Sequence, residues 1–466
     1  MTKLKVLSHA CLHVSTEQTS IIIDPWLVGT CYWRSWSNYP PASFDKSDIE
    51  NVSSVIITHI HWDHWHGPTL KKFFRNKSVI VPKQPNPRCT NDLKSIGIKN
   101  ITELAHNRSV KIGDIQIFLY QFGLYLQDSA VIIKTPDITI LNANDAKLAG
   151  RSLEHLKAVH GPFDFAFRSH SSANNRICFE VEGDSRFTLD DREHYFRSFQ
   201  LFMDKVNPRF AIPFASNHTH INFDSAELYK YVSNPLELEE FLIDAEKSWA
   251  LKTMLPGSSW NSESGFEFFG RQYFENFEKY HEEVRLSTKA TIEKYQSLES
   301  KLMLGDNFSK RLQKFLGNSL SDTTKKNLYF IATSPCGREE VFYYDGRQVF
   351  YNQSELIERD DAIKIVIPNI VLRDAVLKNM FHHAGISKRV RYVAKNRYQL
   401  TQLQRIVAQL EKYELTGGLG AKFYLPLIFS YAHKWREALT YVYAGVMMRF
   451  YKVPLYKIEE IVLKGR

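Results

Sequence analysis

Residues 58–67 read Thr58-His-Ile-His-Trp-Asp-His-Trp-His-Gly67, an H-x-H-x-D-H-x-x-G pattern. The apolar run before it, residues 55–58, predicts a short strand that ends in a tight loop. Side chains at a strand end point in alternate directions. We therefore expect His59 and His61 to face one metal ion, and Asp63 and His64 to face a second. Imidazole nitrogen and carboxylate oxygen suit Zn²⁺, Fe²⁺ and Mn²⁺, so these ligands alone do not select the ion.

A centre with two metal ions needs a bridging carboxylate from a later strand. Asp145 directly follows an apolar run at residues 138–141, which predicts a strand, and we expect it to be this ligand. Residues 121–128 read QFGLYLQD and contain no histidine for the first metal. Asp128 is the one strong ligand there, and we predict that it binds the metal. A carboxylate in place of imidazole hardens the site and favours iron over zinc.

Two histidines follow the apolar run at residues 210–213, within Pro213-Phe-Ala-Ser-Asn-His-Thr-His220. We predict that His220 binds metal and that His218 contacts the substrate or supports a ligand. Together with Asp63, these two histidines are the predicted catalytic residues.

The chain alternates short apolar runs with helical patterns, which is typical of a layered α/β fold. Residues 256–265, PGSSWNSESG, are polar and resemble a linker. We therefore predict a metal-binding catalytic domain at residues 1–255 and a mostly helical α+β domain of unknown role at residues 256–466. A hairpin turned at Asp345-Gly346 is expected in the second domain.

Composition gives a mild bias towards anionic partners. The formal net charge is +9, but the basic residues are interspersed, so nucleic-acid binding is weakly supported. The five cysteines are widely spaced, which argues against a disulfide framework. The most apolar stretch near the end, residues 438–448, is shorter than the ~20 residues that span a bilayer. We expect a cytoplasmic protein without a transmembrane segment.

Several segments resemble one family in order and in rough spacing. They are His9-Ala-Cys11, Asp24-Pro-Trp-Leu27, the metal motif, Pro68-Thr-Leu-Lys-Lys72, Asp145, Asn207-Pro-Arg209 and Pro213-Phe-Ala215. Over residues 5–245 they look like the cytidine monophosphate-N-acetylneuraminate hydroxylase group of the metallo-β-lactamase superfamily. The metal motif alone indicates only the superfamily. The Asp-Pro-Trp-Leu and Pro-Phe-Ala segments restrict the resemblance to the hydroxylase group within it.

The resemblance implies a metallo-β-lactamase αββα sandwich with an iron-type site that activates oxygen and hydroxylates a nucleotide-activated sugar. Leu124 stands about where the family has a histidine. A Rieske cluster needs two cysteine and two histidine ligands, and Cys11-Leu-His13 is the only C-x-H here. We therefore expect no Rieske cluster, and a separate ferredoxin or reductase as electron donor.

Other residues have weaker predicted roles around the site. Asp24 is expected to orient a ligand histidine, because metal-bound imidazoles usually have a carboxylate or carbonyl partner. The predicted substrate-binding residues are Trp33, Arg34, Trp36, His170, Arg176 and His218. Three further histidines are interpreted as structural or exposed: His66, His382 and His383.

Three functions remain open from the sequence. The first is a metal-dependent oxygenase with two divalent ions, iron favoured and zinc or manganese allowed, that acts on a small anionic substrate such as a nucleotide sugar. The second is a dinuclear zinc hydrolase of a phosphodiester, lactone or amide, in which Asp63 orients the attacking hydroxide. The third is a non-enzymatic metal-binding scaffold.

Overall fold

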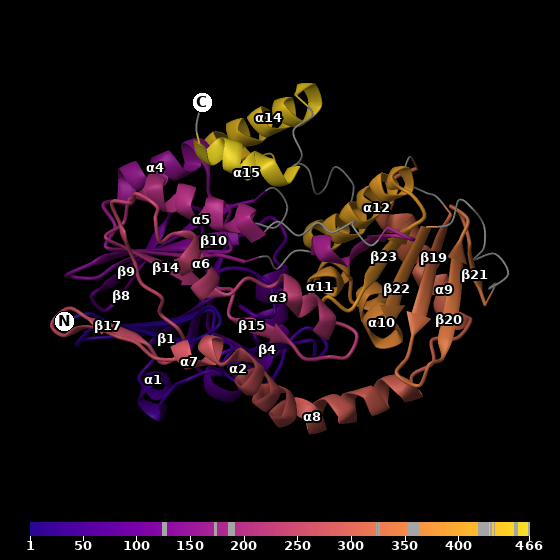
Figure 1. The fold of residues 1–466 in the computed structure, drawn as a ribbon, viewed down its shortest axis with the longest axis horizontal. Helices are drawn as coiled ribbons and strands as arrows, with labels where there is room; N and C mark the ends of the chain where they lie inside the picture. The colour runs from indigo at the N-terminus through magenta and orange to yellow at the C-terminus, as the bar shows by residue number, and fades with distance from the viewer. Residues whose placement is uncertain are drawn as a thin grey trace.

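Two β-sheets lie face to face in the N-terminal half of the molecule, and a third sheet with its own helices forms most of the remainder (Figure 1). The computed structural model describes residues 1–123, 128–171, 175–184, 192–322, 324, 327–352, 363–417, 428, 431–432, 434–451 and 455–464. Leu124, at the position where a histidine was expected, lies outside the described residues.

The first sheet has eight strands. Their order is β18 (Gly265–Glu267), β17 (Ser259–Asn261), β1 (Lys3–Ser8), β2 (Cys11–Ser15), β3 (Ser20–Ile23), β5 (Ser54–Ile56), β6 (Ser78–Pro82) and β7 (Ile101–Leu104). Strands β3, β5, β6 and β7 are parallel, so their carboxyl ends meet at one edge. The metal motif begins directly after β5, at that edge.

The second sheet has seven strands. Their order is β16 (Ala250–Leu251), β14 (Phe210–Phe214), β12 (Phe165–Ser169), β11 (Thr139–Asn144), β10 (Asp128–Lys134), β9 (Ile115–Phe122) and β8 (Ser109–Ile112). Strands β11, β12 and β14 are parallel and also end together. A separate two-stranded sheet pairs β4 (Trp36–Asn38) with β15 (His218–His220).

The core lies between the two large sheets. Because side chains alternate along a strand, Leu4 and Val6 of β1 point inward to meet Ile117 and Leu119 of β9, and all four are fully buried. Helices α1 (Lys46–Glu50), α2 (Gly67–Phe73) and α3 (Arg88–Ser95) cover the outer face of the first sheet. Helices α4 (Gly150–His160), α5 (Arg192–Val206) and α6 (Pro235–Phe241) cover that of the second. The four layers form the predicted αββα sandwich.

The third sheet organises the second domain. Its order is β13 (Phe179–Val181), β23 (Arg391–Ala394), β22 (Ile363–Pro368), β19 (Leu328–Thr333), β20 (Glu339–Tyr344) and β21 (Val349–Tyr351). Its helices are α9 (Asn307–Ser319), α10 (Asn369–Leu377), α11 (Phe381–Ile386) and α12 (Arg397–Thr416). Strands β20 and β21 form the hairpin expected around Asp345-Gly346.

The predicted linker at residues 256–265 is instead part of the first sheet. Strand β17 pairs with β1, and β18 pairs with β17. Trp260 faces the core between the sheets and is 7% exposed, while the polar residues of the following turn, Ser262, Glu263 and Ser264, are exposed. One buried face per strand gives a polar sequence, which explains why the hairpin resembled a linker. Strand β13, which precedes residue 255, belongs to the third sheet, and β17 and β18, which follow it, belong to the first. The predicted boundary at residue 255 therefore does not separate the sheets.

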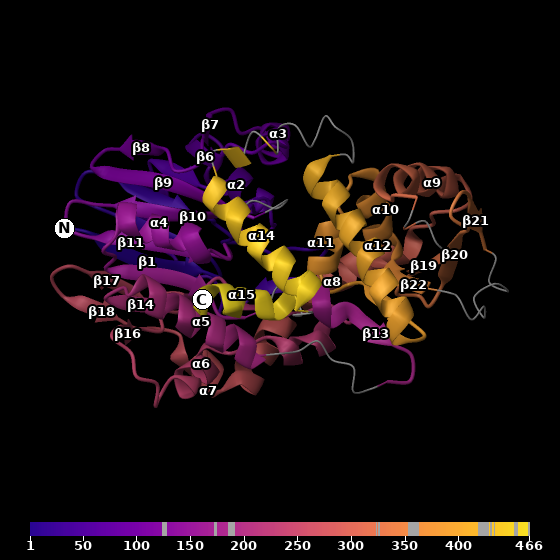
Figure 2. The same cartoon turned by 90° about the horizontal axis from the view of Figure 1, so that it is seen from above.

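Helical segments also connect the two halves. After α7 (Arg271–Glu275), the long helix α8 (Phe277–Lys301) runs along the lower side of the molecule in Figure 1 towards the third sheet. Helix α14 (Trp435–Phe450) returns to lie against α4, and α15 (Leu455–Lys464) lies against α5 (Figure 2). Within the described parts of the chain, no helix is both long and apolar enough to cross a membrane.

Candidate metal centre

The metal motif occupies the loop after β5, where several strands of both sheets end. Three residues at these strand ends have left-handed backbone conformations without being glycine: Asp24 after β3 (φ 47°), Asn144 at the end of β11 (φ 49°) and Ala215 after β14 (φ 50°). Such conformations cost roughly 1–3 kcal/mol each and cluster at functional sites. They turn the chain sharply, so that ligands from different strands converge.

The first group of metal-binding atoms comes from His59, His61 and Asp145. One ligand atom of each lies within 4.8 Å of the others. Nε2 of His59 is 2.8 Å from Nδ1 of His61. The structure thus brings together three of the predicted ligands.

The second group comes from His9, Asp63 and His64, with the same 4.8 Å limit between ligand atoms. Nε2 of His9 lies 3.0 Å from Oδ2 of Asp63. Asp145 joins the two groups, because its Oδ2 is also 3.3 Å from Nε2 of His64. His9 was not among the predicted ligands. It stands in the turn between β1 and β2, at the same sheet edge, within the His9-Ala-Cys11 segment that carried the family resemblance.

Asp128, at the start of β10, borders the first group. Its Oδ1 lies 3.9 Å from Nε2 of His59 and is buried without a hydrogen-bond partner among the residues that the structure describes. Burial and the neighbouring Asp145 carboxylate raise the pKa of Asp128 to about 8. A buried carboxylate close to another one calls for a cation.

The protonation of the motif also suits metal binding. Burial and the neighbouring His64 lower the pKa of His59 to about 4, so its ring is neutral at pH 7, as a ligand must be. Burial raises the pKa of Asp63, but His64 and His9 oppose it and hold that pKa well below its usual range. Burial lowers the pKa of His64, but Asp63 and Asp24 oppose it and raise that pKa well above its usual range, so these carboxylates stabilise a positive charge at the centre.

Asp24 lies behind the second group and is fully buried. Its Oδ2 is 2.8 Å from Nδ1 of His64, and its two oxygens also accept hydrogen bonds from Thr58 and Asn144. Nδ1 of His64 is therefore directed away from the centre, which leaves Nε2 to face it. The geometry suits the orienting role predicted for Asp24.

The two histidines of β15 occupy different surroundings. The His218 ring stacks on Trp36 with centroids 3.7 Å apart and lies 5.4 Å from the His9 ring; neither of its nitrogens has a hydrogen-bond partner. The His220 ring lies 6.2 Å from the Tyr229 ring, and burial together with Lys388 lowers its pKa to about 3. His218 thus lies closer to the second group than the position predicted for it, and the role of His220 as a metal ligand stays a prediction. The antiparallel pairing of β15 with β4 sets this register, which the sequence alone did not reveal.

The second domain contributes His382 of α11. Its Nε2 lies 2.8 Å from Nε2 of His61, and its Nδ1 lies 3.8 Å from Oε2 of Glu411 on α12. The adjacent His383 pairs with Glu414, and its Nε2 lies 3.2 Å from the carbonyl oxygen of Ile60. His383 thus has a structural role, as predicted, whereas His382 contacts the predicted ligand His61 and is more than a structural or exposed residue.

Most of the centre is closed to solvent. The side chains of His59 and His64 are 1% and 0% exposed, whereas those of Asp128, Asp145 and His382 are 15%, 17% and 17% exposed. The last three therefore form the exposed edge of the centre.

The predicted substrate-binding residues Trp33, Arg34 and Trp36 lie in two different places. Trp33 and Arg34 line a cavity of about 300 Å³, together with Trp62 and Tyr295. The Trp33 indole also donates a hydrogen bond to Asp374 of the second domain. Trp36 is fully buried under His218 and does not line this cavity. Its position indicates packing rather than substrate binding.

The remaining predicted residues lie around the centre. His170 is fully buried, and burial together with His9 lowers its pKa to about 3. Arg176 is half-buried in the turn η1 (Asn175–Cys178), where the neighbouring Asn175 donates to Glu411. His66 caps α2 by accepting a hydrogen bond from the backbone N–H of Thr69, which is a structural role.

Known proteins match parts of this chain. Residues 3–122 match the model of the β-lactamase superfamily domain. A protein of Mycobacterium tuberculosis named a Rieske 2Fe-2S iron–sulfur protein is 25% identical over 177 residues, 36% of this chain and 34% of its own. The cytidine monophosphate-N-acetylneuraminic acid hydroxylase of Xenopus laevis is 22% identical over 250 residues, 49% of this chain and 42% of its own. The chain thus spans well under half the length of these relatives.

Solved structures are similar over the same half. The di-iron β-hydroxylase CmlA of Streptomyces venezuelae matches with a TM-score of 0.39 and 18% identity, covering 56% of this chain and 54% of its own. The sequence match, the two packed sheets and the buried His/Asp groups agree with one another. The chain has a metallo-β-lactamase fold over about half of its length, with the superfamily match at residues 3–122 and a distant similarity to the cytidine monophosphate-N-acetylneuraminic acid hydroxylases, and a mixed α/β domain is added to it.

Proposed function

We propose that this chain is a di-iron oxygenase that hydroxylates a small anionic metabolite of the nucleotide-sugar class. The observation that carries the proposal is the Asp128 carboxylate, which lies 3.9 Å from His59 with an unsatisfied buried oxygen. A carboxylate in this position makes the first metal site harder than a site of three imidazoles would be.

The proposed ligands divide between the two ions. His59, His61, Asp128 and Asp145 hold the first, and His9, Asp63 and His64 hold the second, with Asp145 between them. His218 lies beside the second position and completes it. Three carboxylates among these ligands favour iron or manganese over zinc.

The names of the relatives support hydroxylation of an activated sugar. The Xenopus protein and a mouse protein that is 22% identical over 223 residues are both called cytidine monophosphate-N-acetylneuraminic acid hydroxylases. The net charge of +9 also favours an anionic substrate.

Hydroxylation adds one atom of O₂ to a C–H bond and releases the other as water, which consumes two electrons and two protons. When bound, the iron pair supplies the activation of oxygen. The electrons come from a separate ferredoxin or reductase, since the sequence offers no second cysteine–histidine pair for a Rieske cluster.

The chain's own residues position these reactants. The Tyr32 hydroxyl donates to Oδ1 of Asp63 at 2.5 Å and fixes this carboxylate. Asp128, Asp145 and His382 form the exposed edge, where the substrate approaches. Trp33 and Arg34 line the 300 Å³ cavity together with Tyr32, and there they would bind only a part of the substrate that lies away from the metals, since no metal-binding residue lines this cavity.

The test is single-turnover product analysis under ¹⁸O₂. Protein loaded with Fe²⁺ and supplied with a chemical reductant should add one ¹⁸O atom to cytidine monophosphate-N-acetylneuraminate or a related nucleotide sugar. Asp128→Asn should lose most of this product, and Asp114→Asn, in the turn between β8 and β9, should match the unaltered protein. Product that carries oxygen from water, or equal activity with Zn²⁺, would contradict the proposal.

A dinuclear zinc hydrolase of a phosphodiester, lactone or amide is the second candidate. The observation in its favour is the approach of three imidazoles, His9, His64 and His218, at the second position. Imidazole ligands suit zinc. In this alternative Asp63 orients the attacking water. Hydrolysis of such substrates by the zinc-loaded protein, without oxygen or reductant, would select it.

A further inference from the structure

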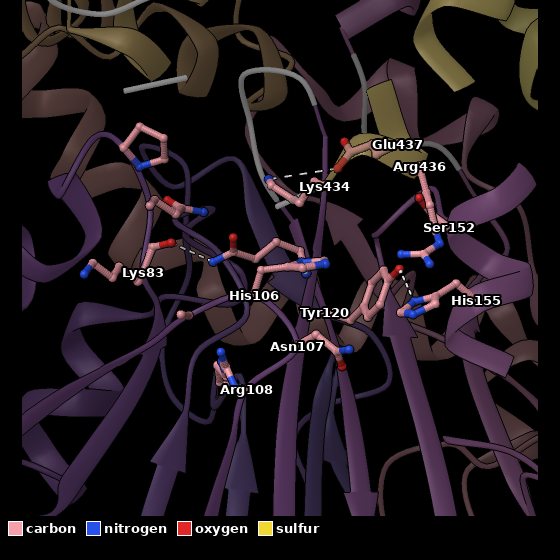
Figure 3. A pocket seen from close by; sticks show the side chains of 14 residues that line it. Lys83, His106, Asn107, Arg108, Tyr120, Ser152, His155, Lys434, Arg436 and Glu437 are labelled. Atoms are coloured by element: carbon pink, nitrogen blue, oxygen red, sulfur yellow. Dashed lines mark hydrogen bonds and ion pairs between the residues drawn. The ribbon is translucent and has the colours of Figure 1, made fainter. Parts of the chain in front are cut away.

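A cavity of about 710 Å³ opens beside the metal domain and shares no lining residue with the two metal-binding groups. Its walls come from the segment after β6, the connection between β7 and β8, strand β9, and helices α4 and α14 (Figure 3). This volume lies within the range of small-molecule sites.

The cavity is strongly cationic. Four basic side chains and one carboxylate line it: Lys83, Arg108, Lys434, Arg436 and Glu437. Lys434 and Arg436 lie above the cavity in Figure 3, and Arg108 lies below it. Burial and Arg436 together lower the pKa of His155, whereas burial raises the pKa of Tyr120 to about 12 against the opposing effect of Arg436.

The carboxylate of Glu437 already accepts hydrogen bonds from other parts of the protein. Oε1 of Glu437 accepts hydrogen bonds from the backbone N–H of Gly123 at 2.7 Å and from the Tyr441 hydroxyl at 2.9 Å. Oε2 of Glu437 lies 4.0 Å from Nζ of Lys434, which is too far for a hydrogen bond. Glu437 therefore holds the end of β9 and forms a buried ion pair with Lys434, so it offsets one of the four basic side chains.

Lys434 supplies the second observation. Its side chain is 1% exposed, and its Nζ has no hydrogen-bond partner among the described residues. A buried ammonium without an acceptor is costly. It also stands at the N-cap of α14, a helix of 16 residues whose N-terminus favours negative charge.

We propose that this cavity binds a phosphate-bearing small molecule, independently of the metal centre. Lys434 and the N-terminus of α14 would contact the phosphate from the buried side. Arg436 and Arg108 would bind it from the open side. Guanidinium groups suit this contact because their paired N–H donors match phosphate oxygens. The ligand would lie beside the end of β9, which contributes Tyr120 and Gln121 to the cavity.

Inorganic pyrophosphate is the probe, and calorimetric titration of the full chain is the measurement. Arg436→Gln and Arg108→Gln should each weaken binding roughly tenfold or more, because a hydrogen bond to a charged group is lost. Arg449→Gln, on the exposed last turn of α14, is the matched control and should bind as the unaltered protein does. A His59→Ala/His61→Ala variant should retain the affinity, because these residues do not line the cavity.

Three results would overturn the proposal. They are the absence of measurable binding to the unaltered chain, full affinity in both arginine variants, and loss of binding when the two metal-binding histidines are removed. The last result would assign the anion to the metal centre.

Discussion

Nε2 of His382 lies 2.8 Å from Nε2 of His61, although 321 positions separate the two residues in the chain. His61 faces the first metal position through Nδ1, so its other ring nitrogen needs an outer partner. Such partners are usually a carboxylate, a carbonyl group or water. Here the partner is an imidazole from the second domain, supported by Glu411. The second domain therefore completes the surroundings of the metal centre.

Replacing His382 should weaken metal binding without removing a ligand. We expect His382→Ala to lower metal affinity by about 10–100-fold, because outer-shell partners of ligand histidines have effects of this size. Competition with a chromophoric chelator measures the affinity. His155→Ala, on α4 and away from the centre, is the control. Unchanged affinity in His382→Ala would show that His61 is held without its partner.

Asp128→His should change which metal the chain selects. An imidazole in place of the carboxylate makes the first position softer, so the purified variant should contain more zinc and less iron than the unaltered chain. Elemental analysis of both proteins, grown in the same medium and purified without added metal, checks this. An identical iron-to-zinc ratio would mean that Asp128 does not contact the metal.

The two histidines of β15 should differ in their effect on metal content. His218 lies 5.4 Å from the His9 ring, whereas His220 lies near Tyr229 and Lys388. We expect His218→Ala to lose metal from the second position and His220→Ala to keep it. Side-by-side elemental analysis decides the point. The reverse result would restore the assignment that the sequence suggested.

A buried ion network holds the domains together. Arg389 forms a two-bond contact with Glu299 of α8, at 2.7 and 3.0 Å, and its Nε donates to Asp224 of the first domain at 2.8 Å. Glu299→Gln should destabilise the fold by about 3–5 kcal/mol, because Arg389 stays buried without its full charge partner. Arg391→Met breaks the exposed pair with Glu180 and should cost at most about 1 kcal/mol. Urea unfolding of both variants measures the difference, and equal midpoints would contradict this account.

Local pattern predicted much of the centre. His59, His61, Asp63 and His64 lie in one loop, and their spacing was sufficient to indicate a metal site. Asp145 could be identified because it directly follows a strand, and strand ends in parallel sheets share an edge.

Distant contacts could not be predicted in the same way. His9 reaches the centre through a turn between antiparallel strands, and His382 reaches it through the packing of a second domain. His382 has no local signal beyond its residue type, and the His9-Ala-Cys11 segment indicated a family resemblance but not that His9 is a ligand. The hairpin at β17 and β18 was misinterpreted because half of its residues face outward and are polar.

The most direct test of the central claim is the metal content of the full chain purified without added metal. The account predicts about two metal ions per chain, with iron as a substantial fraction of them, bound by the two His/Asp groups around Asp145. It also predicts that Fe²⁺, and not Zn²⁺, restores activity to the metal-depleted protein. Stoichiometric zinc alone, with activity restored by zinc alone, would contradict the oxygenase and favour the hydrolase.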